Sequence, residues 1–388
     1  MSDRRGQLGA NLLLLALSLA FTALVAEGGL RLLAHFRNQG LLSIALASPV
    51  PIPPSGRVTL GHMIRLSPDP KIIYEFKPDL EVNFIDAPVT INAAGFRGPQ
   101  YPEAKPVGTR RIVGLGDSFM FGHGVGDSEV YLRVLEDLLN RFSTGTRFEA
   151  INTAVPGYNT VMEIETLETK GLAYAPDVVL IHFVGNDLEL PNFIRVEEPV
   201  LALDRSFLVD LVRGALASSS TVRGGLRRHG LKRSPRVEGA RRFVDKPQDA
   251  PPQYRQMVGW EAWDAAMAEL AALGEEHGFQ PVLVTFSVTF AHRQRRILKV
   301  ARRLGIETLE VGETFREYLD RHGIDEYRDS PLALSEENMH PSALGHQIGA
   351  RVIYSWLCER SFPGELSTCA LAPWDEAGAT AAPAGAGP

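Results

Sequence analysis

Three short polar segments directly follow apolar runs of the chain, and a fourth precedes the last predicted helix. They are Gly116–Ser118, Pro156–Gly157, Gly185–Asp187 and Glu337–Pro341. Functional loops of a parallel sheet lie at the carboxyl ends of its strands, so we expect these segments to meet at one edge. Together they contain a hydroxyl, an imidazole, a carboxylate and several N–H donors. These are the groups that acyl transfer requires.

Ser118 is the candidate nucleophile and His340 the candidate base. Ser118 is the only serine directly at the end of a predicted strand with a glycine two residues before it. His340 would accept the serine proton on one ring nitrogen while the other donates to a carboxylate. Glu337, three residues earlier, is the predicted carboxylate because a tight turn can close that spacing. Glu336 is a possible substitute.

The predicted oxyanion donors are the backbone N–H groups of Ser118 and Gly157 and the side-chain amide of Asn186. Losing one such donor typically costs about 3 to 4 kcal/mol of transition-state stabilisation. Taken singly, each segment could form only a turn. Their combination favours a catalytic site, with Asp187 in a structural role. Of the other histidines, His182 is interpreted as a core residue and His123 as a loop residue with a small chance of lining the substrate cleft.

Near-continuous apolar runs alternate with helical patterns through the middle of the chain. RIVGLG, FEAINTA, DVVLIHFVG, QPVLVTFSV and IETLEVG are the expected strands. Helices are expected over 131–142, 160–172, 254–277, 293–304 and 342–357. This alternation predicts an α/β fold in which helices cover both faces of a parallel sheet.

The four segments, in this order, resemble the four sequence blocks of the SGNH (GDSL-like) hydrolase superfamily. The resemblance covers roughly residues 92–357 and implies a flavodoxin-like three-layer α/β/α sandwich with a serine-dependent reaction. It assigns the family's serine, glycine, asparagine and histidine to Ser118, Gly157, Asn186 and His340. Two positions depart from the pattern: the family usually has aspartate at the position of Glu337 and glycine at that of Val184. INAAGFRG followed by RIVGLGDSFMFGHGV further resembles bacterial membrane-tethered members.

The N-terminus contains a candidate membrane anchor. The run from Leu8 to Ala26 carries no charge, and at ~1.5 Å rise per residue it nearly spans the ~30 Å of a bilayer core. Arg4 and Arg5 precede it and Glu27 follows, so the positive-inside rule places the N-terminus in the cytoplasm and the remainder in the periplasm or outside the cell. A cleavable signal peptide is the alternative, although cleavage after Ala26 would put a leucine three residues before the cut.

The domain organisation follows from these patterns. We expect a cytoplasmic stub and anchor over 1–33, a β-rich lead-in over 34–108, a catalytic domain over 109–360 and a largely disordered tail over 361–388. Residues 190–252 are expected to be a basic insertion in the catalytic domain: either a solvated loop, or a lid or contact for anionic lipid or polysaccharide.

The composition excludes several classes of protein. The formal net charge of -6 gives no reason to expect a nucleic-acid partner. The only two cysteines, Cys358 and Cys369, could pair in an oxidising compartment or be unrelated thiols. Phosphate-loop, complete dinucleotide-binding and His-Glu-x-x-His motifs are missing from the sequence, so we expect no metal and no organic cofactor.

The expected function is ester hydrolysis outside the cytoplasmic membrane, through an acyl-enzyme on Ser118. The substrate would be an ester or an acylated saccharide, and the membrane would be contacted through the N-terminal helix. Two alternatives remain: O-acyl transfer to or from a cell-envelope saccharide, and a non-catalytic binding protein that keeps the fold.

Overall fold

The computed structural model describes residues 2–38, 52, 57–195, 206–209, 231–234, 242–288 and 292–371. Contacts divide the chain into two units. The smaller contains Met1–Val50, Arg65–Tyr74 and Ile194–Lys232, and the larger contains Pro51–Ile64, Glu75–Phe193 and Arg233–Pro388. All four polar segments lie in the larger unit. Most of the expected insertion and the tail beyond residue 371 lie outside the described residues.

The larger unit is built on a parallel sheet of five strands, in the order β12-β11-β8-β6-β7. The strands are β6 (Thr109–Leu115), β7 (Arg147–Asn152), β8 (Val178–His182), β11 (Gln280–Thr285) and β12 (Glu307–Glu310). Every neighbouring pair is parallel. This is the flavodoxin-like order, with its switch point between β6 and β8, where ligands bind in open sheets of this type.

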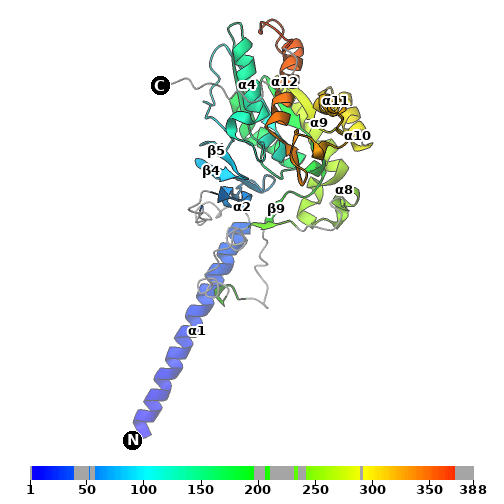
Figure 1. Ribbon diagram of the computed structural model, residues 1–388. Coiled ribbons are helices and arrows are strands. Elements are labelled where there is room, and N and C mark those ends of the chain that lie inside the picture. The colour runs from blue at the N-terminus through cyan, green and yellow to red at the C-terminus, as the bar shows by residue number, and fades with distance from the viewer. Residues whose placement is uncertain are drawn as a thin grey trace. The chain divides into compact units, whose positions relative to one another are not determined.

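Helices cover both faces of the sheet. On one face, apolar side chains of β6, β8 and β11, such as Val113, Val179 and Leu283, form one core with α5, α9 and α10. Neighbouring helices α4, α12 and α11 contact one another in turn as a second group, and Figure 1 shows α4 beside α12. The six helices are α4 (Tyr131–Phe142), α5 (Thr160–Thr166), α9 (Gly259–His277), α10 (His292–Arg303), α11 (Val311–His322) and α12 (Ala343–Arg360). The expected three-layer α/β/α fold is therefore confirmed.

Two helix boundaries differ from those expected by five residues or more. The helix expected over 160–172 ends at Thr166 and continues as a wider turn, η2 (Leu167–Gly171), and then η3 (Leu172–Tyr174). The helix expected from residue 254 begins as α9 at Gly259, because Pro251 and Pro252 favour the short turn η6 (Pro252–Met257) ahead of it.

The lead-in forms small sheets. β1 (Arg57–Val58), β4 (Leu80–Phe84) and β5 (Ala87–Ile91) make one sheet, in which β4 and β5 form an antiparallel hairpin. Bridges from Ile91 to Arg97 and from Arg97 to Asn152 connect this sheet to the end of β7. The lead-in thus reaches the edge of the sheet where the polar segments lie.

The remaining elements are short. They are α2 (Leu60–Met63), β2 (Ile64–Leu66), β3 (Tyr74–Phe76), α3 (Ser118–Phe121), η1 (Asp127–Glu129), η4 (Gly185–Leu188), β9 (Phe193–Arg195), β10 (Leu231–Arg233), α8 (Arg242–Asp245), η5 (Pro247–Asp249), η7 (Tyr327–Asp329), β13 (Ala333–Ser335) and β14 (Asn338–Pro341).

The N-terminal helix α1 (Ser2–Asn38) is long and apolar enough over Asn11–Leu33 to cross a membrane. A signal sequence has the same properties. Within the smaller unit, the Glu27 carboxylate of this helix accepts hydrogen bonds from the N–H groups of Phe207 (3.0 Å) and Leu208 (2.8 Å) and from the Ser206 hydroxyl (3.0 Å). These bonds connect part of the expected insertion to α1.

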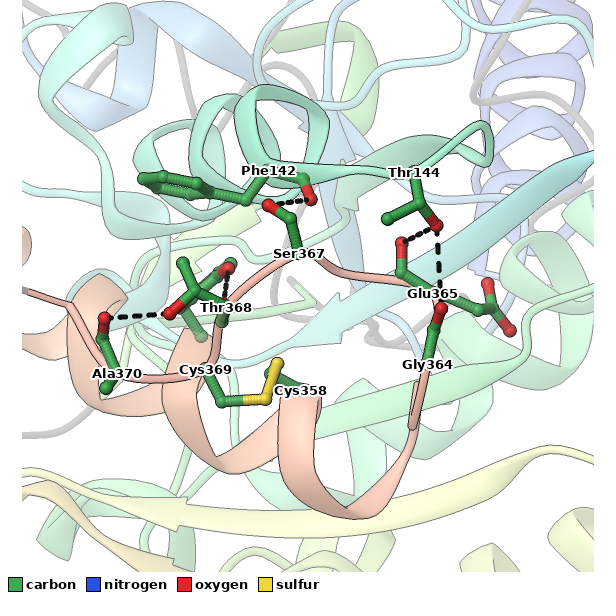
Figure 2. Close-up of a disulfide and its surroundings, with 10 residues drawn as sticks. Phe142, Thr144, Cys358, Gly364, Glu365, Ser367, Thr368, Cys369 and Ala370 are labelled. Atoms are coloured by element: carbon green, nitrogen blue, oxygen red, sulfur yellow. Dashed lines mark hydrogen bonds between the residues drawn. A yellow bond between two sulfur atoms is a disulfide. The ribbon is translucent and has the colours of Figure 1, made fainter.

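The two cysteines pair. Cys358, buried on α12, forms a disulfide with Cys369, and Figure 2 shows the bridge joining the helix to the segment that follows it. Along this segment the Ser367 hydroxyl donates to the Phe142 carbonyl (3.0 Å), and the Thr144 hydroxyl donates to the Glu365 carbonyl (3.0 Å). Residues up to Cys369 are therefore held against α4 and the turn that follows it, although the tail was expected to begin at residue 361.

Candidate active site

Ser118 lies at a sharp turn from β6 into α3. Asp117 caps the short helix, since its Oδ1 accepts the Phe119 N–H at 3.0 Å. A Cβ on Gly116 would lie 2.7 Å from the Met120 Cβ and 3.4 Å from the His182 Cβ, so a larger residue would not fit without displacing Met120. The sequence Gly-Asp-Ser thus lets the chain turn at once and leaves the Ser118 side chain half-buried at the strand end.

His340, which lies near the C-terminal end of the catalytic domain in the sequence, contacts Ser118. Its Nε2 lies 2.8 Å from the Ser118 Oγ, although 222 positions separate the two residues. His340 lies on β14, which pairs with β13 in an antiparallel hairpin just before α12. The structure therefore brings the candidate nucleophile and the candidate base within hydrogen-bond distance.

The group at the other ring nitrogen is Asn338. Its Oδ1 lies 2.6 Å from the His340 Nδ1 and also accepts the His340 backbone N–H at 3.3 Å. An amide oxygen can only accept, so Nδ1 carries the ring proton and Nε2 presents its lone pair to Ser118. Ser118 Oγ–H can then donate to Nε2, which is the arrangement that a general base needs.

The prediction of Glu337, with Glu336 as substitute, does not match this geometry. Both glutamates are exposed, and neither forms a hydrogen bond to His340 among the described residues. The expectation assumed a tight turn that joins positions three apart. Instead β14 is extended, so side chains two apart share a face and Asn338 lies on the same face as His340.

A buried carboxylate lies beside the nucleophile. Asp117 is 1% exposed, and its Oδ2 accepts a hydrogen bond from the Asn186 Nδ2 (2.8 Å). The same Oδ2 lies 3.1 Å from the Ser118 Oγ, whose single proton can go either to this oxygen or to the His340 Nε2. Burial raises the pKa of Asp117. The Asn186 amide has two N–H donors and Asp117 uses one of them, so the other can donate to a substrate oxygen. Asn186 is thus fixed next to Ser118 on the turn after β8.

Gly157 adopts a backbone that favours glycine. Its φ is +80°, and an added Cβ would lie 2.0 Å from the Asn192 Nδ2. The Asn192 N–H donates to the Gly157 carbonyl at 3.0 Å. The Gly157 N–H has no acceptor among the described residues, so it can serve as a donor to substrate.

Two more carboxylates are buried behind the site. Asp187 accepts the Val184 N–H at 2.8 Å and so shapes the turn that carries Asn186, in line with the structural role expected of it. Neither carboxylate oxygen of buried Glu163 has a hydrogen-bond partner among the described residues. Burial and the charge of Asp117 raise the pKa of Glu163 well above its usual range. Burial and the charges of Glu163 and Asp117 do the same to the pKa of Asp187.

Aromatic rings surround the candidate base. His123 is stacked on His340, with ring centroids 4.2 Å apart, and the Phe119 centroid lies 5.1 Å from it. Burial lowers the pKa of His340 to about 4. His182 is buried as expected and its Nδ1 pairs with the Tyr131 hydroxyl at 3.1 Å, but its Nε2 has no partner among the described residues. The interpretation of His123 as a loop residue missed its contact with His340.

A cavity of about 690 Å³ adjoins the site, within the size range of small-molecule pockets. Phe119, Gly185 and Met339, which line it, are the sequence neighbours of Ser118, Asn186 and His340. Eight of the other lining residues are apolar or aromatic: Phe183, Val184, Phe286, Val288, Ile297, Leu319, Ile324 and Tyr327. The remaining ten are polar or charged: His182, Thr285, Ser287, Arg293, Gln294, Arg316, Asp320, Asp325, Glu326 and Arg328. Among the residues that line this cavity, only His182, Val184 and Gly185 were singled out from the sequence, and Met339 lies in the fourth segment.

Comparison with known proteins gives a family. Residues 115–348, more than half of the chain, match the model of the GDSL-like Lipase/Acylhydrolase family. Similar solved structures include LAE5, an alpha/beta hydrolase enzyme from the metagenome of Lake Arreo, Spain, at 17% identity and a TM-score of 0.39, covering 65% of this chain and 95% of that one. Another is Axe2, an acetylxylan esterase from Geobacillus stearothermophilus, at 16% identity and a TM-score of 0.38, covering 63% and 92%. No curated protein matches the chain.

Proposed function

Because the chain belongs to the GDSL-like lipase/acylhydrolase family, we propose that it is a serine esterase that acts outside the cytoplasmic membrane through an acyl-enzyme on Ser118. The observation that carries the proposal is the 2.8 Å contact between the Ser118 Oγ and the His340 Nε2, with the opposite ring nitrogen bonded to Asn338. A hydroxyl bonded to an oriented, neutral imidazole is the arrangement of an activated nucleophile.

The proposed reaction has two halves. The Ser118 Oγ attacks the ester carbonyl while its proton passes to the His340 Nε2. The Ser118 and Gly157 N–H groups and the Asn186 amide stabilise the oxyanion. The imidazolium gives its proton to the leaving alcohol, and an acyl-enzyme remains. His340 then takes a proton from water, whose oxygen attacks the acyl group, and returns it to the Ser118 Oγ as the acid leaves.

Asn338 gives this triad a neutral third member. Its amide oxygen fixes the ring tautomer, as the amide does in Cys-His-Asn sites, but adds no charge to balance the imidazolium. Burial lowers the pKa of His340 to about 4, so the ring is neutral and ready to accept a proton across the neutral pH range. The base therefore depends on position rather than on a carboxylate partner.

The apolar part of the wall of the cavity beside the site supports an ester with one large apolar half. At about 690 Å³ the cavity is far roomier than an acetyl group requires, and burial of apolar substrate surface against its walls contributes roughly 0.8 kcal/mol for each methylene. We therefore propose acyl esters longer than acetate as the substrate class.

Two observations support a location outside the cytoplasm. The Asn11–Leu33 segment of α1 has the length and hydropathy of a membrane span, with Arg4 and Arg5 on its N-terminal side. The Cys358–Cys369 disulfide is of the kind that persists in oxidising compartments and is rare in the cytosol.

The test is labelling with a fluorophosphonate probe, which reacts with activated serines. Wild-type protein should be labelled and should hydrolyse p-nitrophenyl esters, and Ser118→Ala should lose both activities. Ser128→Ala, at an exposed serine in η1, is the matched control and should retain both. No labelling of the wild type would favour a non-catalytic binding protein. Acyl label that goes to an added saccharide rather than to water would favour transfer.

A further inference from the structure

The imidazole ring of His340 has a second histidine against its face. The rings of His123 and His340 lie 4.2 Å apart between centroids, at an angle of 21°. The edge of the Phe84 ring lies against His123, with centroids 5.2 Å apart. The Nδ1 of His123 is buried and has no hydrogen-bond partner among the described residues. The contact of His123 with His340 is therefore made through the ring face.

The backbone fixes His123 in this place. Its N–H donates to the carbonyl of Ser118 at 3.0 Å, so the loop is tied to the nucleophile itself. Gly122 and Gly124, on either side, have φ values of 85° and 82°. A Cβ on Gly124 would lie 2.5 Å from the Leu334 Cδ1, close to the hairpin that carries His340. Two left-handed glycines thus allow the turn that brings His123 against that hairpin.

A buried arginine ties this loop together. Arg97, 4% exposed, donates to the carbonyls of Phe121 (2.5 Å), Gly122 (2.6 Å) and Val125 (2.7 Å). Its Nε pairs with Asp127 at 3.0 Å. One guanidinium therefore binds carbonyls on both sides of His123. Loss of these bonds would leave buried acceptors without partners and would lower the free energy of unfolding. Arg97 belongs to the β-rich lead-in expected over 34–108.

A stacked ring has a specific use in a triad without a carboxylate. When His340 takes the serine proton it becomes a buried cation, and Asn338 offers only a neutral oxygen. A neutral aromatic face within about 6 Å attracts such a cation, by about 0.5 to 2 kcal/mol. The same ring also excludes water from the face of the base and restricts its rotation.

We propose that His123 is a positioning residue of the reaction: its neutral ring holds the His340 imidazole at Ser118 and stabilises the imidazolium, and Arg97 holds His123 in place. The proposal rests on the proposed function, since it assumes that His340 is the base. It extends the site into the lead-in and assigns Arg97 to the support of the site.

The surroundings keep His123 neutral during turnover. Burial, the charge of His340 and that of Arg97 lower the pKa of His123 to about 4, against an opposing effect of Asp117. The other titratable rings near the pair, His182 and His346, are buried, and burial lowers the pKa of each to about 3. Glu336 and Glu337, on the hairpin that carries His340, are exposed. At neutral pH the stacked ring is therefore uncharged and can face a cation.

The experiment compares His123→Phe, His123→Gln and His123→Ala in the full-length protein, with exposed His277→Ala as control. The readouts are the second-order rate of fluorophosphonate labelling from pH 3 to 8, kcat and KM for an ester, and the melting temperature. Phe keeps an aromatic face, whereas Gln keeps size and polarity without a ring. We expect Phe to label within about threefold of wild type, with an unchanged acid midpoint.

Gln and Ala should lower the labelling rate and kcat by about tenfold, with KM unchanged, and should move the acid midpoint upward as water reaches His340. Wild-type rates and an unmoved midpoint in Gln and Ala would overturn the proposal, and so would a loss in Phe as large as that in Ala. If wild-type protein is not labelled at Ser118, the proposed function fails instead, so the two failures are distinguishable. A melting temperature lowered equally in Phe and Gln, with equal rates, would indicate a structural role alone and would also overturn it.

Discussion

The Oδ1 of Asn338 lies 2.6 Å from the Nδ1 of His340, so the residue that orients the candidate base is an amide on the same face of β14 and not a neighbouring glutamate. This contact fixes the ring proton on Nδ1 and leaves Nε2 for Ser118. It also means that the imidazolium formed during reaction has no carboxylate beside Nδ1.

Replacing Asn338 tests this contact. In Asn338→Ala the ring loses its acceptor and can adopt the wrong tautomer, so we expect kcat to fall by about 10²- to 10³-fold, less than the ~10⁴ known for an orienting carboxylate. Glu337→Ala, on the exposed turn, should stay within about twofold of wild type. Measured kcat values for the two variants check the assignment, and a larger loss in Glu337→Ala than in Asn338→Ala would reverse it.

The acid limb of the pH profile should lie unusually low. The reaction needs neutral His340, and burial lowers the pKa of that ring to about 4. Protonation inactivates the base, so kcat/KM should rise with pH through about 4 and be level from about pH 5 upward, whereas an ordinary histidine gives a midpoint near 6.5. Initial ester hydrolysis rates, with folding checked at each pH, measure the midpoint. A value near 6.5 would show that the ring is solvated.

The places in the fold of four candidate site residues, Ser118, Gly157, Asn186 and His340, could be predicted from the sequence, because each follows or precedes an element whose place in a parallel sheet is constrained. The strand order then puts β6 and β8 side by side, so segments far apart in sequence meet. Apolar runs and motif order were enough for this part of the site.

The other residues proposed to act at or near the candidate site could not be found in this way. The position of Asn338 depends on the hairpin of two very short strands, β13 and β14. In the sequence, the four residues from Ser335 to Asn338 have the composition of a polar turn rather than of strands. A two-residue side-chain period was the only signal for it. The role proposed for His123 depends on its stacking on His340, a residue far away in the sequence. The glycines on either side of His123 indicated a turn but not the direction in which its ring points. Arg97 is buried and bonded to backbone carbonyls, and such contacts cannot be recognised from residue types or their spacing.

The Gly157 backbone offers a third test. Gly157→Ala would strain a φ of +80° and place a Cβ 2.0 Å from the Asn192 Nδ2, so the N–H must move. We expect kcat to fall by about 10²- to 10³-fold, as for loss of one oxyanion donor. Gly278→Ala is the matched control, because the φ of Gly278 is +74° but no atom lies within 4 Å of an added Cβ. This variant should lower the stability of the protein and leave its activity unchanged. Equal activity in both variants would remove Gly157 from the site.

Stability should depend on a buried ion pair at the amino end of the sheet. Arg111, fully buried on β6, bonds to the Glu149 Oε2 at 2.8 Å and to the Tyr174 carbonyl at 2.9 Å. Arg111→Ala leaves a buried carboxylate without its partner and should lower the free energy of unfolding by about 3 to 5 kcal/mol. Neighbouring Arg110 makes exposed ion pairs, so Arg110→Ala should cost at most about 1 kcal/mol. Denaturant unfolding of the two variants checks this, and similar losses would contradict it.

The cavity beside Phe119 and Met339 should set substrate preference. If its apolar walls hold the acyl chain, each added methylene should raise kcat/KM by about fourfold, which corresponds to about 0.8 kcal/mol, until the cavity is filled. A series of p-nitrophenyl esters from acetate to decanoate measures this slope. Ile324→Trp, at a half-buried wall position, should shorten the preferred chain and leave acetate hydrolysis within about twofold of wild type. A flat series, or a wild-type preference for acetate that Ile324→Trp does not change, would place the acyl group outside this cavity.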